Sequence, residues 1–362
     1  MKRCTGMTRF RLALSAAALT MGTTWGWLSP LAGQDRSLAL ASQNSGTEAL
    51  LQAVSAVSDD IVWGSGHEAT YVRTIDGGRY WEAGVVPSAG GVQFRDVAAF
   101  DARTAYLMSA GVGAESRIYR TDDGGASWML QHTAEHPEAF FDCMDFWSPD
   151  QGLVYGDAVD GVPFLLRTSD GGLSWSRVPA LALPAALDGE GGFAASGTCV
   201  TTQAGGAAWV AMGSGERARV LRTEDYGESW VATDVPVTGG AGAGLATVQM
   251  GADGAGISLG GVIGNDSIRS DNVAVTTDGG STWQAGGALA MAGPVYGSSL
   301  VPDGGGVVVA VGPGGIDWSA DGGRTWRSAE SVTHWAVAFS SSVHGWAMGP
   351  GGRISKLTLG VR

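Results

Sequence analysis

The stretch RTDDGGASW (residues 120–128) decides the fold, because variants of it recur six times along the chain. Each copy has Ser or Thr, Asp, Gly and Trp at the same offsets, and successive tryptophans are 47, 47, 55, 53 and 43 residues apart. A period in the forties is typical of β-propellers, whose blades contain four strands. The copies end at Trp81, Trp128, Trp175, Trp230, Trp283 and Trp326.

The residues around the second copy indicate four strands per repeat. FRDVAAF (94–100), TAYLMSAG (104–111) and RIYRT (117–121) precede the turn, and SWMLQHT (127–133) follows from it. Short β-branched or alternating runs separated by Gly and Asp predict strands. The turn therefore joins the third strand of each unit to the fourth.

Each residue of the turn has a predicted role. Asp123 is placed to accept backbone N–H bonds, Gly124 and Gly125 are free to adopt positive φ, and Trp128 is expected to pack where the next sheet stacks. The same aspartate recurs at Asp76, Asp123, Asp170, Asp225, Asp278 and Asp321.

A seventh unit without this turn follows the last copy. Its strands are HWAVAF (334–339), GWAMGPGG (345–352) and RISKLTL (353–359). The segment at residues 37–43 is a candidate for its missing outer strand, since closure by the two chain ends leaves no exposed sheet edge. We predict an all-β, seven-bladed propeller of four-stranded antiparallel blades, with six or eight blades as alternatives.

The composition agrees with this fold. Of 362 residues, 59 are Gly, which disfavours long helices. The glycines do not follow a Gly-X-Y period, which excludes collagen. The 44% hydrophobic content excludes wholesale disorder. The formal net charge of −13 and the scarcity of lysine disfavour nucleic-acid binding, which needs a basic surface.

The N-terminal segment resembles a secretory signal. Basic residues at positions 2, 3, 9 and 11 precede an apolar run from 12 to 21, and small residues follow. We expect residues 1–41 to be signal peptide and leader, cleaved after Ala32 or Ala41, and residues 42–362 to form the propeller. An uncleaved anchor is the alternative, although the run is shorter than a membrane span needs. The mature chain is expected to be exported, periplasmic or extracellular, without a membrane span.

The repeated turn matches the Asp-box, or bacterial neuraminidase repeat. With its regularly spaced RTxDGGxSW copies, the chain resembles the photosystem II stability/assembly factor family. Residues 140–161 and 190–199 resemble the non-photosynthetic bacterial branch of that family. The resemblance implies a non-catalytic scaffold that binds a protein partner, such as a membrane-protein assembly intermediate. One propeller architecture hosts unrelated activities, however.

Arginine repeats at one position, immediately before the Thr of the box. Successive blades should place these guanidinium groups in an arc, and Arg suits bidentate recognition of carboxylate or phosphate. Two hypotheses remain open: each arginine braces its own hairpin beside a local acid, or the arc binds a partner. The residues are Arg73, Arg120, Arg167 and Arg222.

Cys143 and Cys199 are the two cysteines that remain after loss of the leader. Both fall in predicted first strands, which line the channel in adjacent blades. In an exported protein a disulfide between the third and fourth blades is favoured, and two buried thiols are the alternative.

Evidence for catalysis is sparse. A sialidase-like or other glycan-directed hydrolase is the alternative function, with channel carboxylates such as Asp142 and Glu190. The sialidase F/Y-R-I-P motif has only FRDV (94–97) as a counterpart. HTAEH (132–136) matches an inverted zincin motif, but a proline follows at once and no helix fits.

No complete dinucleotide or phosphate loop is present. We therefore assign no catalytic residue, metal or cofactor, and expect a monomeric protein-binding scaffold.

Overall fold

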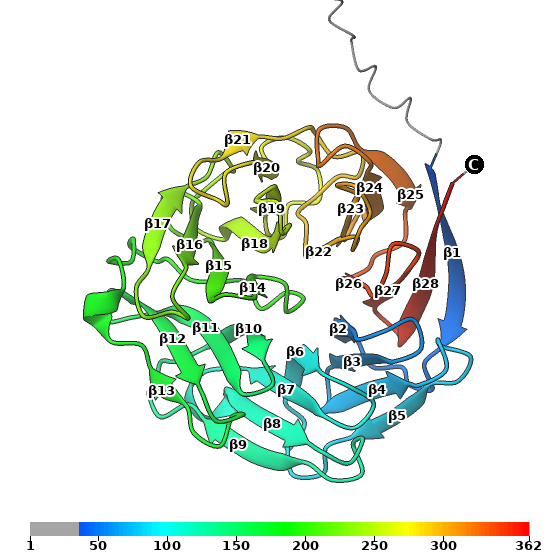
Figure 1. The fold of residues 1–362 in the computed structure, drawn as a ribbon, viewed down its shortest axis with the longest axis horizontal. Coiled ribbons are helices and arrows are strands. Elements are labelled where there is room, and N and C mark those ends of the chain that lie inside the picture. Colours follow the sequence, from blue (N-terminus) through cyan, green and yellow to red (C-terminus); the bar gives the residue numbers. More distant parts are fainter. Residues whose placement is uncertain (1–35, 362) are drawn as a thin grey trace, which may run out of the picture. The chain divides into compact units, whose positions relative to one another are not determined.

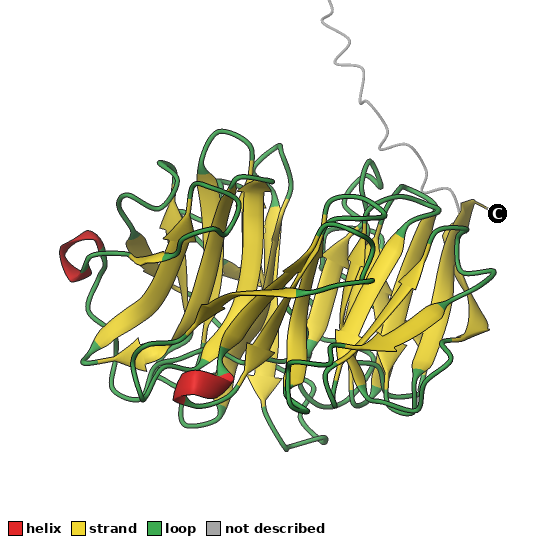
Figure 2. Ribbon diagram, turned by 90° about the horizontal axis from the view of Figure 1, so that it is seen from below, coloured by secondary structure: helices red, strands yellow, loops and turns green. Residues whose placement is uncertain are grey.

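The strands form seven four-stranded antiparallel sheets in residues 36–361, the part of the chain that the structure, a computed structural model, describes. The sheets stand side by side in a ring, and the first strand of each lies nearest the centre (Figure 1). The strands run between two loop-bearing faces (Figure 2). The predicted seven-bladed β-propeller is confirmed.

The first four blades follow one another in chain order. Blade 1 contains β2 (Leu51–Ala56), β3 (Val62–Gly66), β4 (Thr70–Thr74) and β5 (Glu82–Val85). Blade 2 contains β6 (Gln93–Ala99), β7 (Ala105–Ala110), β8 (Arg117–Thr121) and β9 (Met129–Thr133). Blade 3 contains β10 (Phe141–Ser148), β11 (Gln151–Val159), β12 (Val162–Thr168) and β13 (Ser176–Arg177). Blade 4 contains β14 (Val200–Gln203), β15 (Ala207–Met212), β16 (Arg219–Thr223) and β17 (Val231–Asp234).

The remaining blades complete the ring. Blade 5 contains β18 (Ala243–Met250), β19 (Gly256–Val262), β20 (Val273–Thr276) and β21 (Gln284–Ala285). Blade 6 contains β22 (Gly297–Leu300), β23 (Val308–Gly312), β24 (Gly315–Ser319) and β25 (Arg327–Glu330). Blade 7 contains β26 (Ala336–Phe339), β27 (His344–Gly349), β28 (Arg353–Val361) and β1 (Arg36–Asn44). Two short 3-10 turns are η1 (Gly113–Glu115) and η2 (Ala180–Ala182).

The seventh blade joins the two ends of the described chain. β1 pairs with β28 over nine residues, in the order β1-β28-β27-β26. The expectation that residues 37–43 supply the missing outer strand is confirmed. β1 begins at Arg36, so residues 36–41 belong to this blade. The prediction that residues 1–41 are leader, with the later cleavage site after Ala41, had assigned them to the leader. The remainder of the predicted leader lies outside the described residues.

The core consists of layers between neighbouring sheets, as β23 illustrates. Val309 and Val311 pack with blade 7, whereas Val308 and Ala310 pack with blade 5. Alternate residues of a strand point to opposite faces of its sheet, so one strand contributes to two inter-blade layers. Burying one such valine contributes about 1.5–3 kcal/mol. The ring is thus held by apolar contacts on both sides of every blade.

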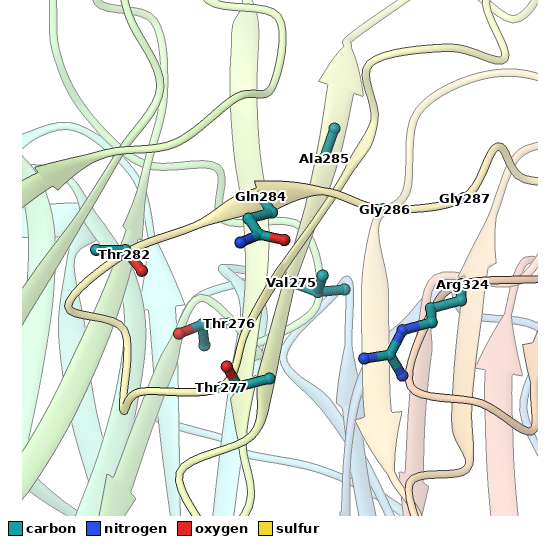
Figure 3. Close-up of a pocket in the computed structure, with 9 residues that line it drawn as sticks. All are labelled: Val275, Thr276, Thr277, Thr282, Gln284, Ala285, Gly286, Gly287 and Arg324. Carbon is teal, nitrogen blue, oxygen red and sulfur yellow. The ribbon is translucent and has the colours of Figure 1, made fainter.

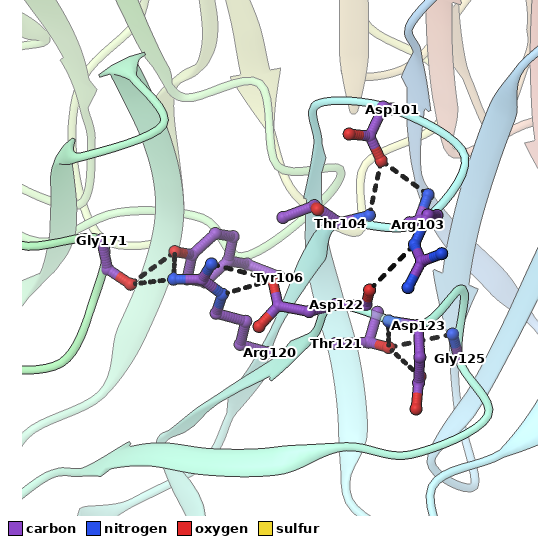
Figure 4. Close-up of polar contacts among 10 residues, drawn as sticks. All are labelled: Asp101, Arg103, Thr104, Tyr106, Arg120, Thr121, Asp122, Asp123, Gly125 and Gly171. Atoms are coloured by element: carbon purple, nitrogen blue, oxygen red, sulfur yellow. Dashed lines mark hydrogen bonds and ion pairs between the residues drawn. The ribbon is translucent and has the colours of Figure 1, made fainter.

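The repeated turn closes with side-chain hydrogen bonds, as Figure 4 shows in part for blade 2. Thr121 Oγ1 donates to Asp123 Oδ1 (2.9 Å) and accepts from Gly125 N (2.9 Å). Asp123 Oδ1 also accepts from Ser127 N at 2.9 Å. Gly124 and Gly125 have φ of +81° and +90°, which residues with a Cβ rarely adopt. The predicted roles of Asp123 and its glycines are observed here.

The tryptophan that ends each turn packs against the preceding blade rather than the next one. Trp128 of blade 2 lies 6.3 Å from the ring of Trp63 and 5.2 Å from that of Tyr71, both in blade 1. The expectation about the direction of this contact was therefore wrong. The ring of Trp128 thus lies in the layer between its own blade and the one before it.

Candidate functional site

The arginine arc lies at the face that carries the repeated turns, which we call the box face. Arg120 Nη1 donates to the carbonyl of Gly171 in the next blade at 2.7 Å and to Tyr106 Oη at 3.0 Å. Its Nη2 pairs with Asp122 at 2.8 Å. Figure 4 shows the guanidinium held between these groups. Arg120 therefore links blade 2 to the turn of blade 3.

Two more arginines make the same kind of link. Arg73 donates to Ala102 O of blade 2 (2.8 Å), and Arg167 donates to Tyr226 O of blade 4 (2.8 Å). Arg222 instead pairs with Glu224 of its own blade. The side chains remain 18% to 26% exposed. The contacts are structural, as the bracing hypothesis expects, but three of the arginines brace the next blade and not only their own hairpin. The partial exposure leaves an edge of each guanidinium open to water.

At the opposite face, residues 191–198 cross the ring between β13 and β14. We call these residues the plug segment, and the face that they cross the plug face. The Ala194 carbonyl accepts from Arg95 Nη1 of β6 at 3.1 Å, and Ser196 Oγ donates to Tyr296 O, next to β22, at 2.7 Å. The segment thus reaches both blade 2 and blade 6. In Figure 1 it extends from beside β14 into the middle of the ring.

A disulfide anchors the end of the plug segment. Cys143 of β10 is joined to Cys199, which directly precedes β14, with a Cα–Cα distance of 5.8 Å. Both residues are fully buried. The bond therefore links blade 3 to the base of the plug segment, as the first of the two sequence hypotheses expects.

The two carboxyls named for the hydrolase alternative lie at the plug face, but both are buried. Asp142 is 1% exposed and Glu190 is 4% exposed. Burial, followed by the nearby charge of Asp157, raises the pKa of Asp142 well above its ordinary value against the opposing effect of Arg95. Glu190 Oε1 accepts from Arg219 Nε at 2.7 Å in a buried ion pair.

The plug segment begins directly on these carboxyls. Gly192 N donates to Asp157 Oδ1 at 3.0 Å. A Cβ on Gly191 would lie 2.0 Å from that oxygen, and one on Gly192 would lie 2.5 Å from Asp142 Cγ. Only glycine permits this approach, so the pair of glycines positions the segment as a cover over Asp142 and Asp157.

Beneath the plug segment the central channel contains a cavity of about 360 Å³. Asp96 and Asp145 line it, and each accepts a backbone N–H from the next blade: Met144 N at 2.6 Å and Thr202 N at 2.7 Å. Burial raises the pKa of Asp145 to about 6. These aspartates connect adjacent inner strands, a structural role that sequence patterns did not reveal.

The groove in Figure 3 lies at the outer edge of blades 5 and 6 and encloses about 360 Å³. It exists because β21 has only two residues before the chain crosses to blade 6, where Gly287 N donates to Gly323 O at 2.8 Å. Arg324 is the one titratable side chain among its lining residues. The groove therefore lacks the paired acid and base that proton transfer requires.

The HTAEH stretch does not form a helix. His132 lies in β9, with its ring stacked on Phe141 at 6.1 Å, and His136 follows in a turn. Within residues 36–361, no group of three His, Cys, Asp or Glu side chains is placed to hold a metal ion. The same residues contain no helix that is both long enough and apolar enough to cross a membrane.

The comparisons with known proteins show a shared fold. No protein-family model and no curated protein matches the sequence. Among solved structures, the chain is similar to YCF48 bound to a D1 peptide, at 18% identity and a TM-score of 0.60, covering 88% of this chain and 96% of that one. YCF48 from Cyanidioschyzon merolae is 17% identical with a TM-score of 0.63, and the match covers 88% of this chain and 99% of that one. A GH74 xyloglucanase from Xanthomonas campestris is 15% identical with a TM-score of 0.60, and the match covers 88% of this chain and 53% of that one.

Proposed function

We propose that this chain is an exported, non-catalytic scaffold that binds a protein partner along the box face of blades 1 to 4. Four boxes carry the arginine, and all four belong to these blades. The same blades expose a large apolar side chain within or next to the box. These side chains are Tyr80 (71% exposed), Met129 (51%), Leu173 (75%) and Tyr226 (38%).

This coincidence is the observation that carries the proposal. Among the described residues, the boxes of blades 5 and 6 have neither the arginine nor a large exposed apolar side chain. Exposed aromatic and aliphatic groups beside partly buried guanidiniums are typical of protein interfaces. The solved complex of YCF48 with a D1 peptide supports a peptide or protein ligand, such as a membrane-protein assembly intermediate.

The hydrolase alternative receives less support. A general acid and a base must reach the substrate, but Asp142 and Glu190 are covered and Glu190 is held by Arg219. The likeness to a GH74 xyloglucanase concerns the fold. We therefore propose binding without chemistry.

Partner capture tests the proposal best through the apolar residues, because the arginines also brace the ring. We would compare wild type, Tyr80→Ser/Leu173→Ser and the control Val112→Ser in crosslinked pull-downs from the source organism's envelope. Val112 is 64% exposed and lies beside η1 in the β7–β8 connection, at the opposite face from the boxes. We expect the double variant to recover about tenfold less of a partner protein, because two interface anchors are removed. The control should recover as much as wild type. Retention of every partner by the double variant would reject the proposal.

We also propose that the signal is cut after Ala32, because a cut after Ala41 would remove most of β1. N-terminal sequencing of the exported protein tests this. A mature chain that begins at Ser42 would contradict it and would leave blade 7 with three full strands.

A further inference from the structure

Three adjacent blades carry the same irregularity at the plug face. In β2, β6 and β10 one extra residue interrupts the pairing with the second strand, and these bulge residues are Gln52, Arg95 and Asp142. A β-bulge re-aims its side chain and is common beside functional sites. In β18 the corresponding bulge residue is Ala246. Blades 1 to 3 thus present an amide, a guanidinium and a carboxyl from equivalent positions, whereas blade 5 presents a methyl group.

The three groups lie within electrostatic reach of one another. β6 contacts both β2 and β10. Gln52 Oε1 is bonded to His67 Nε2 at 2.6 Å, and burial together with the Arg95 charge lowers the pKa of His67. The same guanidinium acts on Asp142. Arg95 is therefore the central member of the trio.

Much of the hydrogen-bonding capacity of the trio is unused. Gln52 Nε2 and both carboxyl oxygens of Asp142 have no hydrogen-bond partner, although the residues are 0% and 1% exposed. Arg95 has no ion pair within residues 36–361, although its Nε and Nη2 donate to Gln93 Oε1 at 3.1 and 2.5 Å. Buried polar groups without partners are rare, and each requires an explanation.

Of the bonds that Arg95 makes, the one to the plug segment is the contact that a ligand would replace, because the others go to Gln93 of the same strand. The Ala194 carbonyl accepts from Arg95 Nη1 at 3.1 Å, as a ligand oxygen would. The segment is flanked by Gly189 and contains Gly197, with φ of +70° and +75°. Glycines at its two ends give the backbone freedom to change conformation while the disulfide at Cys199 retains its base.

We propose that Gln52, Arg95 and Asp142 form the base of a binding site for a small molecule with a single carboxylate group, which enters when the plug segment lifts. Arg95 provides one positive charge. Its Nε–Nη2 edge is bonded to Gln93, so Nη1 and Nη2 are the pair that can donate to the two oxygens of a planar monoanion. The amide of Gln52 adds a neutral donor. Burial raises the pKa of Asp142 well above its ordinary value, which favours the neutral acid that can donate to a carboxylate without repelling it. The site does not depend on the proposed partner surface at the box face.

Ligand chemistry is tested with purified full-length protein and matched probes. Benzoate and acetate would be titrated by calorimetry, with benzamide and acetamide as uncharged counterparts and sulfate as a divalent anion. We expect the carboxylates to bind at least about tenfold more tightly than their amides, since a charge-assisted pair is lost in the amide. Equal binding of acid and amide, or tighter binding of sulfate, would overturn the proposal.

Two near-isosteric variants test the residues. Gln52→Glu places a negative charge at the donor position and is expected to weaken benzoate binding about tenfold or more. Asp142→Asn keeps a neutral donor and is expected to retain binding within about threefold. The reverse order would show that Asp142 acts as an anion toward a cationic ligand and would overturn the assignment.

Arg95→Gln should abolish carboxylate binding, while the control Arg73→Gln on the box face should not. Because Arg95 also bonds Ala194, circular dichroism and hydrogen exchange of the inner strands would establish that each variant is folded. If Gln52→Glu fails to fold, Gln52→Met removes the same donor without a charge. Unchanged benzoate affinity in both folded variants, Arg95→Gln and Gln52→Met, would reject the site.

Discussion

The box face and the plug face of one ring are built by different means. At the box face six similar turns hold exposed aspartates in hydrogen bonds that lower their pKa, as at Asp123. At the plug face single-copy residues such as Asp142 and Glu190 are buried beneath one connection. Repetition thus identifies the residues that build blades, whereas the buried carboxyls at the plug segment occur once. The predictions below test this contrast.

The largest difference is expected between two ion pairs. Glu190→Gln leaves the buried Arg219 guanidinium without its charge partner and should lower the free energy of unfolding by about 3–5 kcal/mol. Glu228→Gln breaks the pair with Arg167, where the glutamate is 70% exposed, and should cost less than about 1 kcal/mol. Urea unfolding measures both. Equal losses would contradict the contrast between the faces.

Reduction of the Cys143–Cys199 disulfide should act mainly on the plug face. We expect the free energy of unfolding to fall by about 2–4 kcal/mol because the unfolded chain regains its freedom. Hydrogen exchange should accelerate in residues 191–198, while the box turns retain their protection. Mass spectrometry after alkylation without reductant is the control. If both thiols are free in the protein purified from its own compartment, the disulfide is absent and the prediction fails.

The smallest effect concerns pH, where a channel aspartate and a box aspartate should behave oppositely. Burial raises the pKa of Asp145 to about 6, so its contribution to stability is complete below about pH 4 and is lost as pH rises through 6. Hydrogen bonds from Ser127 lower the pKa of Asp123 to about 2, so its contribution is present above about pH 4 and is lost as pH falls through 2.

Carboxyl carbon NMR between pH 2 and 8 measures both titrations directly. Asp145→Asn is the control, because it should reduce the change in stability between pH 4 and 6 by the Asp145 contribution, without affecting the signal of Asp123. If Asp145 titrated below pH 4, its raised pKa would be refuted.

Most of the fold was predictable because it depends on local chemistry that repeats. The Thr-x-Asp-Gly-Gly turn needs only a short stretch of chain, so RTDDGGASW alone indicates the third-to-fourth-strand connection. The closing role of residues 37–43 was also predictable, since the seventh unit lacked one strand. The direction of tryptophan packing was not, because it depends on how a finished sheet meets its neighbour.

The candidate site was far less predictable. Asp142 and Glu190 were named, but their burial follows from residues 191–198, whose path across the ring has no periodic signal. Arg95 was noticed only within an imperfect F-R-I-P match, and Gln52 was missed. A bulge shifts the alternation of a strand by one residue, so a regular inward–outward pattern misassigns these side chains. The common pattern of an apolar residue, a polar residue and a small or acidic residue in LQA, FRD and FDC was the available signal.

Because β1 pairs with β28, the ring can close only after the last strand has been synthesised. These strands pair Arg36 with Val361 and are thus the first and last of the described strands to be synthesised. Joining positions so distant along the chain carries a large loop-closure cost and is slow. A nascent or truncated chain therefore carries an unpaired β1 and an open gap between blades 1 and 6, which proteases and chaperones can recognise. Completion of the ring thereby distinguishes a chain that carries both β1 and β28 from one that lacks either.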